Sequence, residues 1–211
     1  MTEAETVGGM AAPRTPYPEA ARNLLRETLF GAMRDELERR TWSEITMSDV
    51  AGAAGVSRQT LYKEFGSREE FAQAFVIDVG DRFLDEVDAA VRRHLDDPRA
   101  AIGAALETFL RTAGEDSVVR VLLRDDGTGG MLPFVTTQGM PVVVFATAKL
   151  FETISEGWPE APPEKAQLLA EALVRLAISY VTAPASTPDE TARKAGELLG
   201  PFIDKALGVA A

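Results

Sequence analysis

The 211-residue sequence contains no cysteine, and this absence removes several kinds of chemistry at once. Without cysteine there is no disulfide, no thiolate nucleophile and no cysteine-ligated metal or iron–sulfur centre. The single histidine, His94, cannot form a site that needs several histidines. The composition therefore predicts no metal site and no cofactor, and nothing in it points to an oxidising compartment.

Long hydrophobic runs and a basic leader are missing as well. The longest apolar stretch lies around residues 142–146, which is far shorter than the roughly 20 residues of a membrane-spanning helix. Glu3 and Glu5 stand where a signal peptide would carry positive charge, and no apolar segment follows them. We therefore expect a cytoplasmic protein that makes no contact with a membrane.

Positive charge is scarce, because 22 lysines and arginines face 33 aspartates and glutamates and give a formal net charge of -11. The molecule as a whole therefore creates no field that attracts DNA, RNA or anionic lipid. The acidity is uneven, since residues 1–66 hold 8 basic and 10 acidic side chains and residues 67–211 hold 14 and 23. A small recognition surface in the first part is still compatible with these numbers.

Helical periodicity runs through almost the whole sequence. Apolar residues recur at the three- and four-residue spacing of a buried helix face, and no segment of useful length alternates like a strand. Residues 142–144 are three valines with strand propensity, but they lie in a segment that we interpret as mostly helical. We predict an all-α fold of about nine helices: 17–40, 46–53, 57–64, 67 to the break at 96–98, 98 through 110, 116–124, 131–155, 164–182 and 188–207. The tail before them, residues 1–16, is small, polar and proline-bearing, and we expect a flexible arm.

Residues 47–66 carry the pattern of a helix-turn-helix. This motif needs a small residue where the two helices approach, a permissive residue at the turn, and apolar side chains that face inward. Ala51, Gly55 and Leu61 meet these three demands. The interior is completed by Val50, Ala54, Val56 and Phe65.

The second helix of this motif presents polar side chains outward. Thr46 and Ser57 are placed to cap the two helices, each worth on the order of 1 kcal/mol. Arg58 and Gln59, near the start of the second helix, could read base edges in a major groove, and Thr60 shares their face. Other side chains of the window suit phosphate contacts. The candidate DNA-contacting residues are Thr46, Ser57, Arg58, Gln59, Thr60, Tyr62, Lys63 and Arg68.

These residues carry a resemblance to a known family. The run Ile45-Thr46-Met47-Ser48-Asp49-Val50-Ala51, followed by Ala54-Gly55-Val56-Ser57, Thr60-Leu61-Tyr62, Phe65 and Ser67-Arg68-Glu69-Glu70-Phe71, resembles the tetracycline-repressor (TetR) family. The resemblance implies a three-helix DNA-binding domain, an all-α ligand-binding domain and a homodimer formed by the last two helices. On this sequence we place the DNA-binding domain at 17–66 and the effector-binding and dimerisation domain at 67–211. It further implies a repressor, not an enzyme, that binds a palindromic DNA operator and is released by a small molecule. Glu64 departs from the family pattern, where a basic residue or histidine is frequent; it either faces away from DNA or weakens the attraction to its backbone.

Residues 58–71, 132–139 and 174–180 are similar to actinobacterial members tied to alkane and fatty-acid metabolism, which suggests an apolar, long-chain acyl or alkyl effector. Aromatic stripes could line its pocket, although such stripes are also typical of plain core, and buried polar residues could orient a head group. The candidate pocket residues are Phe83, Phe109, Leu122, Phe134, Gln138, Phe145 and Tyr180. The expected dimer interface comprises Leu169, Leu173, Leu176, Leu198, Phe202 and Ile203, because single helices at 164–182 and 188–207 could not hide them all within one chain.

The same sequence features also have alternative interpretations. The window 47–66 could be a helical hairpin in an ordinary core. The glycines at 127–130 could cradle a phosphate, but the missing Walker lysine, G-x-G-x-x-G spacing and preceding strand favour a loop. For the whole chain, the rivals are an enzyme acting on an apolar substrate and a ligand-binding or adaptor protein that does not bind DNA. No nucleophile, base and orienting group stand together in the sequence, so we expect no catalytic residues.

Overall fold

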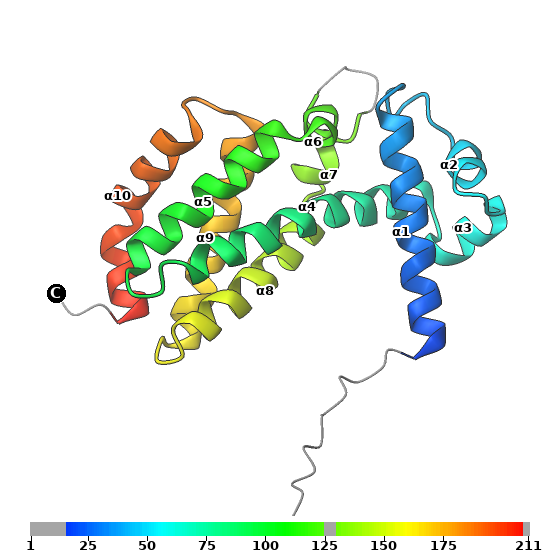
Figure 1. Cartoon of the computed structure of the whole chain (residues 1–211). Helices are drawn as coiled ribbons and strands as arrows, with labels where there is room; N and C mark the ends of the chain where they lie inside the picture. Colours follow the sequence, from blue (N-terminus) through cyan, green and yellow to red (C-terminus); the bar gives the residue numbers. More distant parts are fainter. Residues whose placement is uncertain (1–15, 125–129, 209–211) are drawn as a thin grey trace, which may run out of the picture.

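The computed structural model describes residues 16–124 and 130–208, and every regular element in those ranges is an α-helix (Figure 1). The all-α prediction is confirmed. The predicted flexible arm, apart from Pro16, and residues 125–129 of the glycine-rich segment lie outside the described residues. The ten described helices are α1 (Tyr17–Leu37), α2 (Met47–Ala53), α3 (Arg58–Phe65), α4 (Arg68–Arg92), α5 (Pro98–Glu115), α6 (Ser117–Leu122), α7 (Leu132–Val135), α8 (Met140–Gly157), α9 (Pro163–Thr182) and α10 (Pro188–Leu207).

The predicted helix over 131–155 is two helices, which is why the structure has one helix more than the nine expected. Pro141 has no backbone N–H and is tolerated only in the first turn, so α8 begins there. Gly139 lies so close to the end of α7 that a Cβ on it would meet the Val135 carbonyl oxygen at 2.4 Å. Any larger residue would push the turn open, so the close turn between α7 and α8 needs a glycine at this position.

The helix-turn-helix forms from α2 and α3 as its capping residues require. The Thr46 hydroxyl accepts a hydrogen bond from the Asp49 backbone N–H, and the Asp49 carboxylate accepts one from the Thr46 N–H at 2.8 Å. Ser57 caps α3 by accepting from the Thr60 N–H at 3.0 Å. At the turn between the helices, Gly55 has a φ of 68°, in the left-handed region that a glycine adopts without steric cost.

Helix α4 belongs to two hydrophobic cores. Its first half, with Phe71 and Phe75 fully buried, packs into a core with α1, α2, α3, α6 and Phe134. Its second half, with Val87 and Val91, packs into a core with α5, α8, α9 and α10. Figure 1 shows α4 crossing from α1–α3 at one end of the molecule to the helices at the other end. The core therefore continues across the boundary expected at residue 67.

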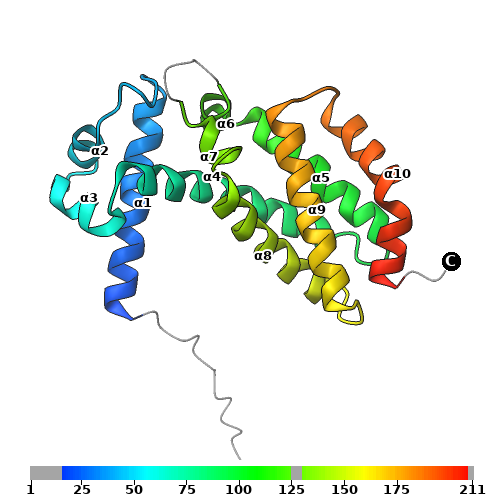
Figure 2. The same cartoon turned by 180° about the vertical axis from the view of Figure 1, so that it is seen from behind.

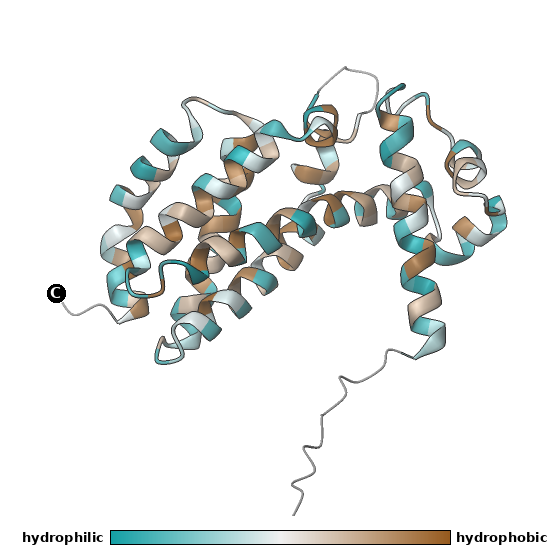
Figure 3. Cartoon of the chain, in the orientation of Figure 1, coloured by the Kyte–Doolittle hydropathy of each residue, from teal (hydrophilic) through white to brown (hydrophobic). Residues whose placement is uncertain are grey.

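The helices at the other end form a layered bundle. Helix α5 packs against both α4 and α10, and α8 packs against α4 and α9. Viewed from behind, α9 and α10 lie at the end farthest from α1–α3 (Figure 2). Apolar residues concentrate on the inner faces of these helices (Figure 3), as amphipathic helices around a shared core require.

An ion pair joins α1 to α4. The Arg34 guanidinium donates to the Asp78 carboxylate, and it lies 5.7 Å from the centre of the Phe75 ring. Both charged side chains are largely withdrawn from solvent, at 22% and 29% exposure. Burial is the largest influence on Asp78 and raises its pKa, although the charge and hydrogen bond of Arg34 act in the opposite direction. Arg34 is therefore the main group that favours a charged Asp78 on α4, with a smaller contribution from the charge of Arg82.

We expect Arg34→Met to lower the free energy of unfolding by about 1–2 kcal/mol at neutral pH, because it leaves the Asp78 carboxylate without its donor. Removing Arg34 takes away the influence that lowers the pKa of Asp78, so burial raises this pKa further in the folded variant. The loss therefore grows as the pH rises above the ordinary range of an aspartate and shrinks in acid. Urea unfolding at about pH 7 and about pH 4 measures both values.

Asp78→Asn is the matched control, because the amide keeps the shape, accepts from Arg34 and does not titrate. We expect it to change stability by under about 1 kcal/mol at both pH values. An Arg34→Met variant whose loss is equal at neutral and acid pH would contradict this account of the ion pair.

Candidate DNA-binding surface and effector cavity

Helix α3 buries one face and exposes the other. Leu61 and Phe65 are buried at 0% and 7% exposure, while Arg58, Gln59 and Lys63 are exposed. The two apolar residues are four apart and therefore hold one side of the helix against the core. The sequence-predicted base-reading residues consequently face solvent at the outer edge of the molecule.

The polar side chains of this surface differ in whether other side chains already bind them. Within the described part of the chain, Gln59 and Lys63 have no hydrogen-bond partner. Arg58 lies 5.1 Å from the centre of the Tyr62 ring and points Nη2 toward the Tyr62 hydroxyl at 3.5 Å. The hydroxyls of Ser57 and Thr60 are 2.9 Å apart and bond to each other.

Two further candidates are engaged in holding the fold. The Thr46 hydroxyl donates to the Asp49 carboxylate at 2.7 Å as part of the cap of α2. The Arg68 guanidinium lies 4.2 Å from the centre of the Trp42 ring and donates to the Trp42 carbonyl oxygen at 2.5 Å. These side chains position the starts of α2 and α4, and fewer of their donors remain for a phosphate than the sequence indicates.

A cavity of about 120 Å³ lies between α4, α5, α8 and α9, and α6 closes one side of it. Its wall includes the edge-to-face pair of Phe83 and Phe109, whose ring centres are 6.3 Å apart. Every residue of the lining is a valine, isoleucine, leucine, phenylalanine, alanine or glycine. No side chain of the wall can therefore bond to a polar group of a ligand.

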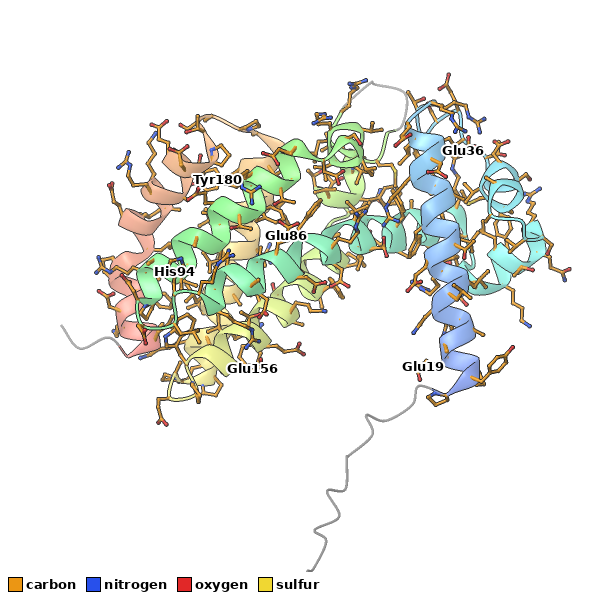
Figure 4. All side chains as sticks on the ribbon, in the orientation of Figure 1. Glu19, Glu36, Glu86, His94, Glu156 and Tyr180 are labelled. Atoms are coloured by element: carbon orange, nitrogen blue, oxygen red, sulfur yellow. The ribbon has the colours of Figure 1, made fainter. Side chains whose placement is uncertain are left out.

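Four of the seven predicted pocket residues line this cavity: Phe83, Phe109, Leu122 and Phe145. The other three lie elsewhere. Phe134 is buried in the core around α1 and α4, and Gln138 is exposed in the turn that follows α7. Tyr180, labelled in Figure 4, packs against a separate cluster formed by Leu106 and Leu110 of α5 and Ala192 and Ala195 of α10.

Gln138 and Tyr180 do not line this cavity, because a polar residue within an apolar segment does not reveal which face of its element it occupies. The sequence reasoning also missed the stretch of α4 that forms one wall, Val76, Ile77, Val79 and Gly80. The only signal for it was the apolar periodicity of this helix, which core packing explains equally well.

The outer surfaces of α9 and α10 differ from the predicted dimer interface. Leu169, Leu173 and Ile203 are buried inside the chain, at 0%, 5% and 0% exposure. They face α5 and α8, because the apolar stripe of each helix is first used by the chain's own core. The exposed part of the predicted set is Leu198, at 71%, with Leu176 and Phe202 half-buried. Leu168, exposed at 56%, was not predicted.

Other kinds of site are not evident in the described ranges. Residues 16–124 and 130–208 hold no group of three or more histidine, aspartate or glutamate side chains placed to hold a metal ion. None of the helices in these ranges is both long enough and apolar enough to cross a membrane.

Comparison with known proteins agrees with this arrangement. Residues 29–75 match the family model for bacterial regulatory proteins of the tetR family, and residues 97–201 match the model for the C-terminal domain of the bacterial tetracyclin repressor. The chain is 37% identical, over 91% of both proteins, to the HTH-type transcriptional regulator AlkX of Mycobacterium tuberculosis.

Solved structures give the same result. The crystal structure of the TetR family repressor AlkX from Dietzia sp., implicated in the biodegradation of n-alkanes, matches with a TM-score of 0.75 and 36% identity, over 86% of this chain and 96% of that one. A TetR-family regulator from Pectobacterium atrosepticum shares the fold alone, at a TM-score of 0.60 and 18% identity, over 92% of this chain and 98% of that one. The chain belongs to the TetR family and is a helix-turn-helix transcriptional regulator.

Proposed function

We propose that the chain represses transcription by placing α3 of two subunits in successive major grooves of a palindromic operator. The observation that carries this proposal is the exposed N-terminal half of α3, where Gln59 has no partner within the described residues. An amide at this position can form paired hydrogen bonds with an adenine edge. Arg58 and Tyr62 already support each other, and together with Lys63 they suit the DNA backbone. The protein then acts where the chromosome lies, in the cytoplasm.

The proposed effector is a hydrocarbon chain. A carboxylate taken into the α4–α5–α8–α9 cavity would lose water and find no donor among the lining residues, which is costly. An apolar chain meets no such cost. The repressor AlkX from Dietzia, implicated in n-alkane biodegradation, supports the same class of compound.

The cavity size gives the proposed effector a way to act. At about 120 Å³ it is similar to an engineered cavity of about 150 Å³ that accommodates benzene, so a long chain enters only if α4 and α8 separate. Val76, Ile77 and Val79 line the cavity, and Asp78 between them is paired with Arg34 of α1. A shift of α4 therefore reaches α1 directly. A ligand that favours one spacing of the two α3 helices by about 1–3 kcal/mol is sufficient for control.

We propose that the homodimer forms through α9 and α10. Leu168 and Leu198 are large apolar side chains exposed at 56% and 71% on these helices, and two subunits would cover them in an isologous contact. Both helices lie at the end farthest from α1–α3 (Figure 2). This arrangement leaves both copies of α3 free for DNA.

For DNA recognition, we expect Gln59→Ala to weaken binding to a specific duplex by about 5- to 150-fold, because one base contact is lost. Binding to a scrambled duplex stays unchanged. Lys63→Ala weakens binding to both duplexes and reduces the slope of affinity against salt by about one. Fluorescence anisotropy over a salt series measures these effects on a duplex that the wild-type chain selects from a random pool.

Arg111→Ala, on the exposed side of α5, is the control for loss of one positive charge far from α3. We expect it to leave both affinities within about twofold. If the wild-type chain selects no sequence, or if Gln59→Ala binds the selected duplex like wild type, the assignment of α3 as the reading helix is wrong.

For assembly, we expect Leu198→Glu to raise the dimer dissociation constant at least about 100-fold, because a carboxylate would be buried without a partner. The monomer should remain folded, since Leu198 is exposed at 71% within the chain. Sedimentation velocity and circular dichroism test the two statements. Val144→Glu on α8, at a site exposed at 61%, is the control and should stay dimeric; equal behaviour of the two variants would exclude this interface.

For the effector, we expect dodecane to raise the unfolding temperature and dodecanoate to do so much less. Gly80→Leu should abolish the response, because Gly80 lines the cavity and a Cβ on it would meet no atom within 4 Å. The added side chain then occupies the space of the ligand. Thermal unfolding with and without each compound measures the effect.

Gly103→Leu is the matched control, because Gly103 is also helical with open space around its Cβ position but does not line the cavity. This variant should respond to dodecane like wild type. A Gly80→Leu variant that still responds, or equal stabilisation by dodecanoate, would contradict a hydrocarbon effector in this cavity.

A further inference from the structure

Glu64, the residue that departs from the family pattern, is bound by two arginines of α1. Arg22 Nε donates to both carboxylate oxygens, at 2.8 and 2.9 Å, and Arg26 Nη1 donates to one of them at 2.8 Å. The Glu64 side chain is exposed at only 10%. It is therefore turned away from the outer face of α3 and onto α1.

The position of this carboxylate is locally unfavourable. Glu64 is the penultimate residue of α3, and a negative charge near a helix C-terminus opposes the helix dipole. Burial is the largest single influence on Glu64 and opposes its ionisation, but the hydrogen bonds and charges of Arg26 and Arg22 together lower its pKa below the ordinary value. The two arginines thus more than compensate for a charge that α3 alone would disfavour.

The same contacts extend to the buried end of α3. The Arg26 guanidinium lies 4.7 Å from the centre of the Phe65 ring and 5.5 Å from that of Phe30. Phe65 packs edge to face on Phe71 of α4 at 5.0 Å. Arg26 therefore contacts both the carboxylate and the aromatic residue at the end of α3.

Helix α3 is short and packs on the core through one face. It contains 8 residues, of which Leu61 and Phe65 are buried and Tyr62 packs partly against the same core. Apolar packing has little directional preference, whereas a carboxylate held by two arginines at the edge of that face resists rotation about the helix axis. Such a rotation would move Gln59 relative to the bases.

We propose that Glu64 is a positioning residue of the recognition helix: through Arg22 and Arg26 it fixes the orientation of α3 against α1 and so sets the angle at which α3 presents Gln59 and Arg58 to DNA. This inference rests on the proposed role of α3 in reading the operator. It assigns to a negatively charged residue a favourable effect on DNA binding.

The proposal is tested by whether removing the negative charge weakens or tightens DNA binding. Glu64→Gln and Glu69→Gln each remove one negative charge near α3, and charge alone predicts that both tighten binding to any DNA. Glu69 is exposed at the start of α4 and has no partner within the described residues, which makes it the matched control. We expect Glu64→Gln to weaken binding to the selected duplex at least about fivefold, the low end of the loss of one base contact, while binding to the scrambled duplex is unchanged or tighter. Glu69→Gln should weaken neither.

A double-mutant cycle tests whether Glu64 acts through Arg26. If Glu64 acts through Arg26, the variant with both Arg26→Ala and Glu64→Gln loses no more affinity for the selected duplex than the weaker-binding single variant. Additive losses would overturn the proposal.

Three further results would overturn it. The first is a Glu64→Gln variant that binds the selected duplex as tightly as Glu69→Gln does. The second is an equal loss on the selected and scrambled duplexes, which is the signature of partial unfolding. The third is tighter binding to both, which would mean that Glu64 only masks the arginines. In each case, selection of a sequence by the wild-type chain leaves the proposed function standing; if the wild-type chain selects none, both proposals fall.

Discussion

The burial of helix α4 in two cores is the constraint on which the rest of the structure depends. Phe71 and Phe75 have no exposed surface and pack with α1 and α3, while Val91, also fully buried, packs with α5, α8 and α9. Because both ends of one 25-residue helix are fixed in close-packed surroundings, a continuous helix and not a flexible linker joins the two cores. The Arg34–Asp78 pair adds a polar connection on the same helix. The proposed change of helix spacing at the cavity would therefore also reach α1.

The chemistry of the cavity follows from this arrangement. A helix that must be apolar on both sides to satisfy two cores contributes Val76, Ile77 and Val79 to the cavity wall, and its charged Asp78 turns to α1. The neighbouring helices present only apolar residues to the same space. Selectivity for the proposed effector would then rest on shape and on the absence of polar groups, since a buried polar group without a partner is costly. Among the described residues, no acidic side chain enters the cavity wall.

The helices and the fold class could be predicted from the sequence, but what covers each face of a helix could not. Caps such as Thr46 and Ser57 are local signals that act within three residues, and the structure has both. The predicted pocket residues Gln138 and Tyr180 do not line the cavity, and the predicted interface residues Leu169 and Ile203 are buried within the chain, for a different reason. Periodicity shows that a helix has an apolar side, but it does not show whether another helix of the same chain, a cavity or a second subunit covers that side. The split at Gly139 likewise depends on an approach to the Val135 carbonyl oxygen that appears only in three dimensions.

Glu64 shows why a departure from a family pattern is informative. A carboxylate at the end of a helix that reads DNA violates two local preferences, one set by the helix dipole and one by the phosphates. Residues that break local rules are expected where function requires it, and here Arg22 and Arg26 surround the carboxylate within hydrogen-bonding distance. Because a protein with a net charge of -11 gains little from general attraction to DNA, its affinity depends on correctly oriented contacts. A negative charge that improves orientation is then worth more than the small attraction that it removes.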